Sequence, residues 1–219
     1  MTYDYGDAYK SYPIQSGTAV FDGGSRLKVH DIMNPLPAWM LDADCIFTDS
    51  PWNTGNLRTF YTKAEIQPGF DATFETFFHR LFACIADIRP KSCWLEIGKE
   101  YLADYIVEMR KIYKYVTFFN SMYYKKNTNY CYVVRGSSSS ARGIHLDGMD
   151  ESDIIKWVCE NEDASCVGDL CMGQGLVACA AYSNGRRFVG TELNHKRLSV
   201  TISKVVKLGA TYHIEEEYP

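Results

Sequence analysis

The stretch that most restricts the fold of this chain is residues 44–55, which read DCIFTDSPWNTG. The segment 44–48 is short, largely apolar and partly β-branched, and this pattern predicts a buried strand. A cluster of Ser, Pro, Asn and Gly follows, and neither a strand nor a helix is expected to continue through it. Asp49 and Trp52 are therefore expected at the carboxyl end of a central strand, the edge where open α/β sheets bind ligands.

Short apolar runs recur along the rest of the chain and alternate with helical patterns. Six further strands are predicted, over residues 25–32, 93–98, 115–119, 130–134, 165–170 and 187–192. Apolar residues at helical spacing predict helices over residues 73–88, 101–112, 152–158, 176–182 and 194–206. Strands that alternate with helices indicate a mostly parallel sheet covered on both faces. We therefore expect an α/β fold with a Rossmann-like, mostly parallel seven-stranded sheet.

Bulk properties narrow the class of protein. A chain of 219 residues fits one domain, so we expect a single domain over 1–219 with an N-terminal arm over 1–20. The net charge of −4 argues against a surface that binds nucleic acid everywhere, but it allows a local basic patch. No run approaches the ~20 apolar residues of a membrane helix, and the acidic start does not resemble a signal peptide. Eight cysteines without a C-x-x-C pair favour a reducing, cytoplasmic setting and no metal site.

A second informative stretch runs from Asp169 to Glu192. Gly173 and Gly175 form a turn between a predicted strand and a helix, and Glu192 ends the next strand. Such a turn lets a ligand approach the backbone, and an acid in that position can accept both hydroxyls of a ribose. These parts suit a dinucleotide or S-adenosylmethionine. Ala178 stands where a third glycine of the dinucleotide fingerprint is sought, and Asp169 would repel a pyrophosphate, so S-adenosylmethionine is favoured.

The loop at residues 49–52 has the groups that a planar, amino-bearing ring needs. Asp49 and a carbonyl at Ser50 or Pro51 are acceptors, and Trp52 offers a stacking face. An exocyclic amine on a base is a poor nucleophile because its lone pair is delocalised into the ring. Two acceptors on its N–H groups would shift the nitrogen towards tetrahedral, and in-line methyl transfer would then depend on positioning and electrostatics. The base would have to leave the duplex to reach Trp52.

Together the two stretches resemble the S-adenosylmethionine-dependent amino methyltransferases of DNA. In that family a D-P-P-Y/W loop binds the target base and a glycine turn binds the cofactor. Residues 49–55, DSPWNTG, are similar to the D-P-P-Y-N-T-G of the circularly permuted class often called beta, in which the target loop comes first. Ser50 replaces the first proline, and Leu170 and Cys171 displace the aromatic residue expected after Asp169. The resemblance spans about residues 25–207 and implies a circularly permuted methyltransferase order.

The resemblance also implies roles for individual residues. The catalytic set is the target loop, which consists of Asp49, Ser50, Pro51 and Trp52. The expected cofactor-binding residues are His30, Asp31, Asp49, Ser152, Asp169, Leu170, Cys171, Gly173, Gly175, Leu176, Glu192 and Leu193. An Asp at the first loop position favours adenine N6 over cytosine N4 as the target.

A hairpin and loop over 123–145 is expected to face the target or the DNA. Candidate DNA contacts are basic residues in loops after the target site and around this segment, namely Arg58, Lys63, Lys125, Lys126, Arg135 and Arg142. The expected partners are DNA and S-adenosylmethionine, with no membrane. A homodimer or a partner that confers specificity stays open, because the chain offers no obvious large recognition domain.

Several alternatives remain at this point. The substrate of the same chemistry can be cytosine N4, RNA adenosine or a protein glutamine amide, and salt-dependent preference for duplex DNA would separate these classes. A non-catalytic scaffold with a methyltransferase fold is a second alternative, supported by Ser50 and the altered cofactor turn. An NAD-dependent dehydrogenase is disfavoured by the glycine pattern. The recognition sequence and a role in restriction-modification, phage protection or gene regulation are not indicated by the sequence.

Overall fold

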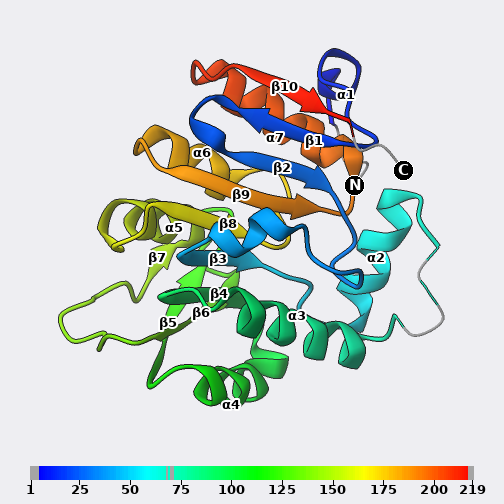
Figure 1. Ribbon diagram of the computed structural model, residues 1–219. Helices are drawn as coiled ribbons and strands as arrows, with labels where there is room; N and C mark the ends of the chain where they lie inside the picture. The colour runs from blue at the N-terminus through cyan, green and yellow to red at the C-terminus, as the bar shows by residue number, and fades with distance from the viewer. Residues whose placement is uncertain (1–4, 68, 70–71, 217–219) are drawn as a thin grey trace.

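All ten strands in the described part of the chain belong to one sheet, in the order β10-β1-β2-β9-β8-β3-β4-β6-β5-β7 (Figure 1). The computed structural model describes residues 5–67, 69 and 72–216. The five central strands run parallel, and they are β2 (Arg26–Val29), β9 (Arg187–Glu192), β8 (Cys166–Asp169), β3 (Cys45–Asp49) and β4 (Ser92–Ile97). The predicted α/β fold with a mostly parallel sheet is therefore confirmed.

The strands outside this centre complete and extend the predicted set. On one side β4 pairs antiparallel with β6 (Tyr130–Ser137), β6 pairs antiparallel with β5 (Tyr115–Met122), and β5 pairs with the short edge strand β7 (Met149–Asp150). On the other side lie β1 (Thr18–Phe21) and β10 (Tyr212–Glu215). The prediction of seven strands is corrected to ten. The strand β7 has only two residues, and β1 lies in a polar and aromatic segment without a clear period.

The predicted N-terminal arm is also revised. Residues 1–4 lie outside the described residues, whereas α1 (Ala8–Ser11) contacts α7 and β1 pairs with both β2 and β10. The end of the expected arm is thus part of the sheet. The four residues of β1 are all buried, so the strand has no alternation of buried and exposed side chains. Its burial in the tertiary structure stabilises it instead.

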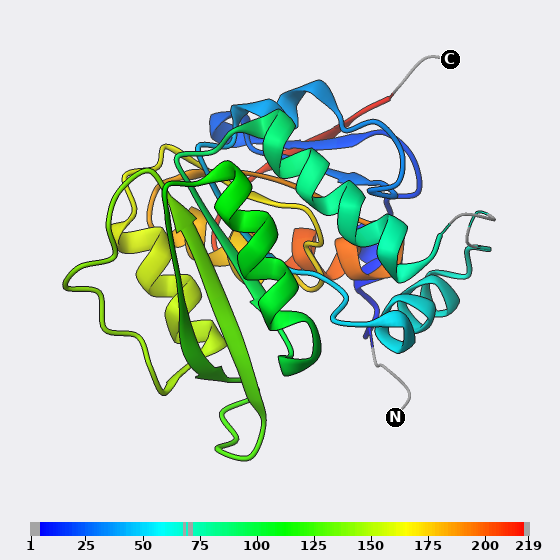
Figure 2. The same cartoon turned by 90° about the horizontal axis from the view of Figure 1, so that it is seen from below.

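Helices cover both faces of the sheet (Figures 1 and 2). One face carries α5 (Glu151–Asn161), α6 (Leu176–Ser183) and α7 (His195–Lys207), and the other carries α3 (Phe74–Ile88), α4 (Leu102–Ile112) and the 3-10 helix Ala38–Asp42. Two further 3-10 turns are Asp22–Gly24 and Lys99–Tyr101. Side chains of β3 alternate between the two cores, since Phe47 packs with α5–α7 and Ile46 with α3–α4. The sheet is therefore buried on both faces, as parallel sheets require.

The order along the chain agrees with the predicted permutation. The strands β8 and β9 come last among the five central strands in the sequence, yet they lie between β2 and β3 in space. The loop after β3 and the glycine turn after β8 are consequently neighbours at the carboxyl edge of the sheet, although 121 residues separate Thr48 from Asp169. None of the helices in the described ranges combines the length and the apolar character needed to cross a bilayer.

The helix α2 (Thr54–Ala64) was not predicted, because the residues before it read as a breaker cluster. Asn53 is the N-cap of this helix, and its side chain accepts a hydrogen bond from the Asn56 N–H, which is the usual role of Asn at this position. The buried residues Leu57, Tyr61 and Ala64 recur at helical spacing and pack α2 against the carboxyl edge of the sheet. The cluster therefore ends the strand and begins a helix.

Two helix starts next to the site are set by side-chain caps. The predicted cap of α7 is confirmed, since the Asn194 side chain accepts hydrogen bonds from the N–H groups of Lys196 and Arg197. The helix expected from Ser152 starts one residue earlier, because Asp150 accepts the Ser152 N–H at 3.1 Å and acts as the cap. An ionised Asp caps a helix start well because it also faces the positive end of the helix dipole.

Candidate active site

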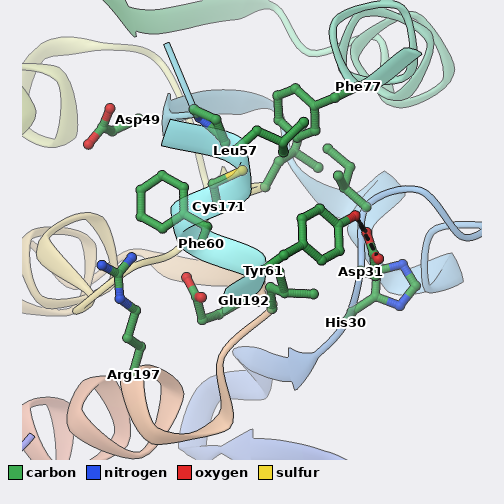
Figure 3. A pocket seen from close by; sticks show the side chains of 14 residues that line it. His30, Asp31, Asp49, Leu57, Phe60, Tyr61, Phe77, Cys171, Glu192 and Arg197 are labelled. Carbon is green, nitrogen blue, oxygen red and sulfur yellow. Dashed lines mark hydrogen bonds between the residues drawn. The ribbon is translucent and has the colours of Figure 1, made fainter. Parts of the chain in front are cut away.

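The carboxyl ends of β2, β9, β8, β3 and β4 meet along one edge, and a cleft with two recesses opens there. The first recess has a volume of about 490 Å³, counted to include its opening to solvent, and α2 covers it with Phe60 and Tyr61 (Figure 3). The second recess lies towards β4 and the hairpin between β5 and β6. Asp49, Cys171 and Arg197 line both recesses, so the two recesses are halves of one cleft.

The cofactor-binding residues predicted from the sequence gather around this cleft, with one exception. In the first recess lie His30, Asp31, Asp49, Leu170, Cys171, Glu192 and Leu193. In the second recess lie Asp49, Ser152, Asp169, Cys171, Gly173 and Leu176. Gly175 lines neither recess, because it packs against Thr201 below the turn.

Two carboxyl groups mark the first recess. Glu192 is buried at the end of β9, and its side chain accepts hydrogen bonds from the Gly173 N–H at 2.7 Å and the Asn194 N–H at 2.9 Å. Burial raises the pKa of Glu192, and these N–H groups and the Arg197 charge oppose that shift. Asp31 follows β2 and accepts the Tyr61 hydroxyl at 2.9 and 3.1 Å, as Figure 3 shows. Both acids are thus held by hydrogen bonds at the rim of the recess.

The turn after β8 needs glycine at two positions. Gly173 and Gly175 have φ angles of +56° and +77°, in the left-handed region that other residues rarely adopt. A Cβ atom at Gly175 would also lie 2.4 Å from Cγ2 of Thr201 on α7. The second glycine therefore allows the turn to pack against α7, and this packing holds the Gly173 N–H on Glu192.

Asp169 links the turn to the strand that carries the target loop. Asp169 is 3% exposed. Its Oδ1 accepts hydrogen bonds from the Thr48 hydroxyl at 2.5 Å and from the Cys171 N–H at 3.0 Å. Thr48 Oγ1 in turn accepts the Leu170 N–H at 2.8 Å. Burial raises the pKa of Asp169 to about 7, with the charges of Asp49 and Glu192 adding to the shift. The carboxyl group thus ties β3 to the turn after β8.

This burial predicts that Asp169 makes stability depend on pH. The folded protein keeps the Asp169 proton up to about pH 7, whereas an unfolded chain releases it near pH 4, so this contribution to stability is present in acid and is lost as pH rises through 7. In Asp169→Asn, we expect the fall in the free energy of unfolding between about pH 5 and about pH 8 to be smaller by about 2 kcal/mol. Urea denaturation at the two pH values measures this difference. Asp104→Asn, an exposed site on α4, is the control, and an equal pH dependence in wild type and Asp169→Asn would contradict the prediction.

The target loop begins with Asp49 at the end of β3. The residue is exposed to the cleft, and its Oδ1 accepts the Trp52 Nε1–H at 2.9 Å. Protein atoms surround the cleft on its other sides, and this desolvation raises the pKa of Asp49 to about 7. The hydrogen bond from Trp52 and the charge of Arg197 lower the pKa, whereas the charge of Glu151 raises it. Asp49 therefore changes charge near neutral pH.

The residues after Asp49 are fixed by their neighbours. Ser50 is 2% exposed, and its Oγ lies 3.1 Å from the hydroxyl of Tyr105, a fully buried side chain of α4. The replacement of the first proline is thus accommodated by a buried hydrogen bond. The rings of Trp52 and Tyr123 pack edge to face with their centroids 5.4 Å apart. A Cβ atom at Gly98 would lie 2.9 Å from Cε3 of Trp52. Gly98 therefore lets the indole ring lie close against the end of β4.

Sequence reasoning missed several residues of the cleft. Phe60 lies between the two recesses, and the Arg197 guanidinium sits 4.8 Å from its ring centre (Figure 3). Apolar residues at helical spacing in 57–64 are the signal that would have found α2. For Glu96 the signal is different, because an acid stands within the otherwise apolar strand β4. For Arg197 the sequence gives only its distance of three residues from the Asn194 cap, and packing determines its direction.

The candidate DNA contacts are spread over different parts of the molecule. Lys125 and Lys126 are exposed at the tip of the β5–β6 hairpin, and Lys125 lines the second recess. Arg58 is exposed and Lys63 half-buried, and both lie on α2 instead of in the predicted loop. These four basic residues lie on the elements that border the cleft.

The two remaining candidates do not fit a DNA contact at the cleft. Arg135 is 3% exposed, its Nε lies 3.0 Å from Glu162 Oε1, and its guanidinium also donates to the Ser139 carbonyl. Arg142 is exposed but follows β6 on the side of Ser92, where β4 begins, at the edge opposite the cleft. The predicted loop over 123–145 therefore faces the cleft only through its hairpin tip.

In the part of the chain that the structure describes, no three His, Cys, Asp or Glu side chains lie where they could hold a metal ion together. The cysteines in the described residues are free thiols, six of them buried and two half-buried. The carboxyl groups of the cleft are instead bonded to backbone N–H groups, hydroxyl groups and Trp52.

Comparisons with known proteins agree on the fold. No protein-family model and no curated protein matches this sequence. Among solved structures, the chain is similar to TTHA0409 from Thermus thermophilus, a candidate DNA modification methylase complexed with S-adenosyl-L-methionine, with a TM-score of 0.57, 13% identity and coverage of 83% of this chain and 93% of that one. It is also similar to the M1.HpyAVI–SAM complex, with a TM-score of 0.53, 11% identity and coverage of 75% and 89%.

A third similar structure is the PvuII DNA methyltransferase, which is cytosine-N4-specific, with a TM-score of 0.52, 9% identity and coverage of 83% and 90%. The chain has the fold of DNA methyltransferases. In this methyltransferase fold the cleft described above lies at the carboxyl edge of the sheet, where the sequence predicted it. Because the identities are low, the likeness concerns the fold, and the chemistry must be argued from the residues of this chain.

Proposed function

We propose that this protein is an S-adenosylmethionine-dependent methyltransferase that modifies the exocyclic amino group of a base flipped out of DNA, with adenine N6 as the target. The observation that carries the proposal is the union of two recesses in one cleft, one bordered by Asp31 and Glu192 and the other by the loop from Asp49 to Trp52. A nucleoside fits the first recess and an aromatic amine fits the second, with Asp49 at the junction. The similarity of the fold to TTHA0409 and M1.HpyAVI, which have been solved with this cofactor, supports the choice of cofactor.

The residues of the first recess fit S-adenosylmethionine chemically. Glu192 offers carboxylate oxygens to the ribose hydroxyls, and Asp31 offers an acceptor to the adenine amino group. Phe60, Tyr61 and Leu193 provide apolar walls for the adenine ring. When bound, the cofactor supplies an electrophilic methyl group. The protein supplies the position of that group and excludes water with α2.

The residues of the second recess fit an amine. Asp49 and the carbonyl of Ser50 accept the two N–H groups, which makes the nitrogen lone pair more available and stabilises the positive charge that develops on nitrogen. Trp52, held against Gly98, offers a face for the base. The choice of adenine N6 rests on the Asp at the first loop position, since a cytosine-N4-specific enzyme shares the fold.

The proposed DNA surface is the rim of the second recess. Tyr124 is 68% exposed at the tip of the β5–β6 hairpin, next to the exposed Lys125 and Lys126. The Lys125 N–H donates to Asp150 at 2.6 Å, which fixes the tip beside the start of α5. Exposed cations and aromatic faces are the groups that bind phosphates and unstacked bases. Arg58 on α2 extends this surface on the other side of the target loop.

The test is transfer of tritiated methyl groups from S-adenosylmethionine to unmethylated genomic DNA, followed by digestion to nucleosides. We expect the label in N6-methyladenine, incorporated about 100- to 1,000-fold more slowly by Asp49→Asn. Label in N4-methylcytosine would correct the target base, and label only with RNA or protein substrates would overturn the DNA proposal. Cofactor binding without transfer to any of these substrates would favour a scaffold.

The contact between Gly98 and Trp52 gives a separate prediction. Gly98 has a φ of −72°, so alanine is allowed by the backbone, but its Cβ would clash with the indole ring. Gly98→Ala should displace Trp52 and lower kcat/KM for DNA by about 10- to 100-fold, because small misplacements of a reacting group have effects of this size. Steady-state kinetics measure the fall in kcat/KM, and near-ultraviolet circular dichroism reports the displacement of Trp52. Cofactor affinity should stay unchanged, and full activity in Gly98→Ala would rule out a stacking role for Trp52.

A further inference from the structure

Beside Asp49 lies a second acid that the proposed chemistry has not used. Glu96 is 2% exposed on β4, and strand register places it directly opposite Asp49 on β3. Paired residues of neighbouring strands project to the same face at a backbone spacing of about 5 Å. Both residues line the second recess. Glu96 is therefore a buried neighbour of the group that contacts the amine.

Glu96 is joined to a third acid. Its carboxyl group shares a hydrogen bond with the carboxyl group of Glu151, the first residue of α5, which is half-buried and lines the same recess. A carboxylate has no hydrogen to donate, so a hydrogen bond between two carboxyl groups requires a proton on one of them. Burial raises the pKa of Glu96 well above its usual value, with the negative charges of Asp49 and Glu151 adding to the effect. Glu96 thus holds the proton, and Glu151 accepts the hydrogen bond.

The surroundings favour one shared proton between these two groups. From β6, the Cys131 thiol bonds to Glu96, and from β7, Asp150 adds a negative charge next to Glu151. The backbone of Tyr124 donates to Glu151, and Lys125 faces Asp150. Arg197 on α7 adds a positive charge that acts on Asp49. A fully ionised pair would be costly here, whereas a singly protonated pair keeps its hydrogen bond.

We propose that Asp49, Glu96 and Glu151 form a proton relay that carries the proton of the target amine from the floor of the cleft to solvent. This inference rests on the proposed function. In the transfer step the amine lone pair forms the new N–C bond, and the C–S bond breaks with its electron pair left on sulfur. The methylated nitrogen then has one proton too many and gives it to the Asp49 carboxylate. Asp49 passes a proton to Glu96, Glu96 gives its own proton to Glu151, and Glu151 releases one to water.

The kinetic test is Glu96→Gln, which keeps the size of the side chain and can still donate a hydrogen bond to Glu151. An amide cannot take up and pass on the Asp49 proton at neutral pH. We expect kcat to fall about 10- to 100-fold near neutral pH, as for the loss of a group in general acid–base catalysis, with the KM for cofactor unchanged. The rate of the variant should rise steadily with pH, because hydroxide replaces the relay, whereas the wild type should level off. Glu151→Gln should change the profile in the same direction.

A matched control and a spectroscopic readout complete the test. Asp153→Asn removes a carboxylate from the same helix, where the side chain is 46% exposed and pairs with Lys156, and it should leave the rate and pH profile unchanged. Infrared difference spectra of wild type and Glu96→Gln should show the C=O band of a protonated carboxyl group that the variant lacks. Wild-type pH profiles in both Glu variants would overturn the relay. Absence of methyl transfer by the wild type would instead overturn the proposed function and with it the relay, and the infrared band would still report the shared proton.

Discussion

Asp49→Asn is expected to lower kcat for methyl transfer by about 100- to 1,000-fold while the protein stays folded. The amide oxygen of Asn can still accept the Trp52 Nε1–H, so the target loop should keep its geometry. The variant loses the negative charge that stabilises the developing positive charge on the amine nitrogen. It also loses the site that takes the amine proton.

The pH dependence of the same reaction provides a second signature of Asp49. Because the cleft raises the pKa of Asp49 to about 7, the ionised form is lost as the pH falls through this value. We expect the wild-type kcat to decrease with falling pH below about 7, and this limb should be absent from the residual activity of Asp49→Asn. Single-turnover measurements over a pH series test this, since they separate chemistry from product release.

The control for this series is Asp104→Asn, which changes an exposed acid on α4 and should have wild-type rates. Affinity for the cofactor, measured by titration calorimetry, should change much less than kcat in Asp49→Asn. Retention of more than about a tenth of the wild-type kcat in this variant would contradict a catalytic role for Asp49.

The second large effect is expected for Glu192→Ala, which should weaken cofactor binding by about 100-fold. The deletion removes the acceptor proposed for the ribose hydroxyls, and it leaves the N–H groups of Gly173 and Asn194 without their partner. The turn that forms the floor of the site then loses its anchor to β9. A buried donor that loses its partner costs about 1–3 kcal/mol, so the thermal stability should also fall.

Two comparisons separate these contributions. Glu192→Gln keeps an acceptor for the Gly173 N–H, and we expect it to restore most of the stability but only part of the cofactor affinity. Glu160→Gln, an exposed acid on α5, serves as the neutral control. Calorimetry with S-adenosylmethionine and thermal denaturation give the two quantities. Unchanged affinity in Glu192→Ala would show that the cofactor does not use the first recess.

The central part of the fold could be predicted because its signals are local. Each of the seven predicted strands is present, since each is a short apolar run between breaker residues. The strands β1 and β10 were not predicted in the same way, because they pair with each other from opposite ends of the described chain, and such a pairing leaves no local signal. The helix α2 was missed for a different reason. The residues that end β3 also include Asn53, which caps the next helix. An interpretation based on breaker residues alone predicts the end of the strand but not the start of this helix.

The candidate site was predictable where a residue ends a strand. Asp49, Asp169 and Glu192 all end parallel strands, and strand polarity alone brings such residues to one edge. Basic residues were harder to place, because the sequence does not show in which direction a charged side chain points. Arg135 is buried against Glu162, whereas Arg197, which was not selected, points into the cleft. Glu96 was overlooked because its strand is otherwise apolar, although an acid in such a strand is costly and therefore informative.

The position of α2 has a consequence for the way the two halves of the cleft fill. This helix follows directly from the target loop, contacts Asp31 through Tyr61, and is held at Lys63 by the Asn194 side chain, which donates to the backbone oxygen at 2.7 Å. A single rigid element is thus the wall of both recesses. Any shift of α2 that accompanies binding in one recess changes the shape of the other, so the two affinities are thermodynamically linked, and the linkage has the same magnitude in both directions.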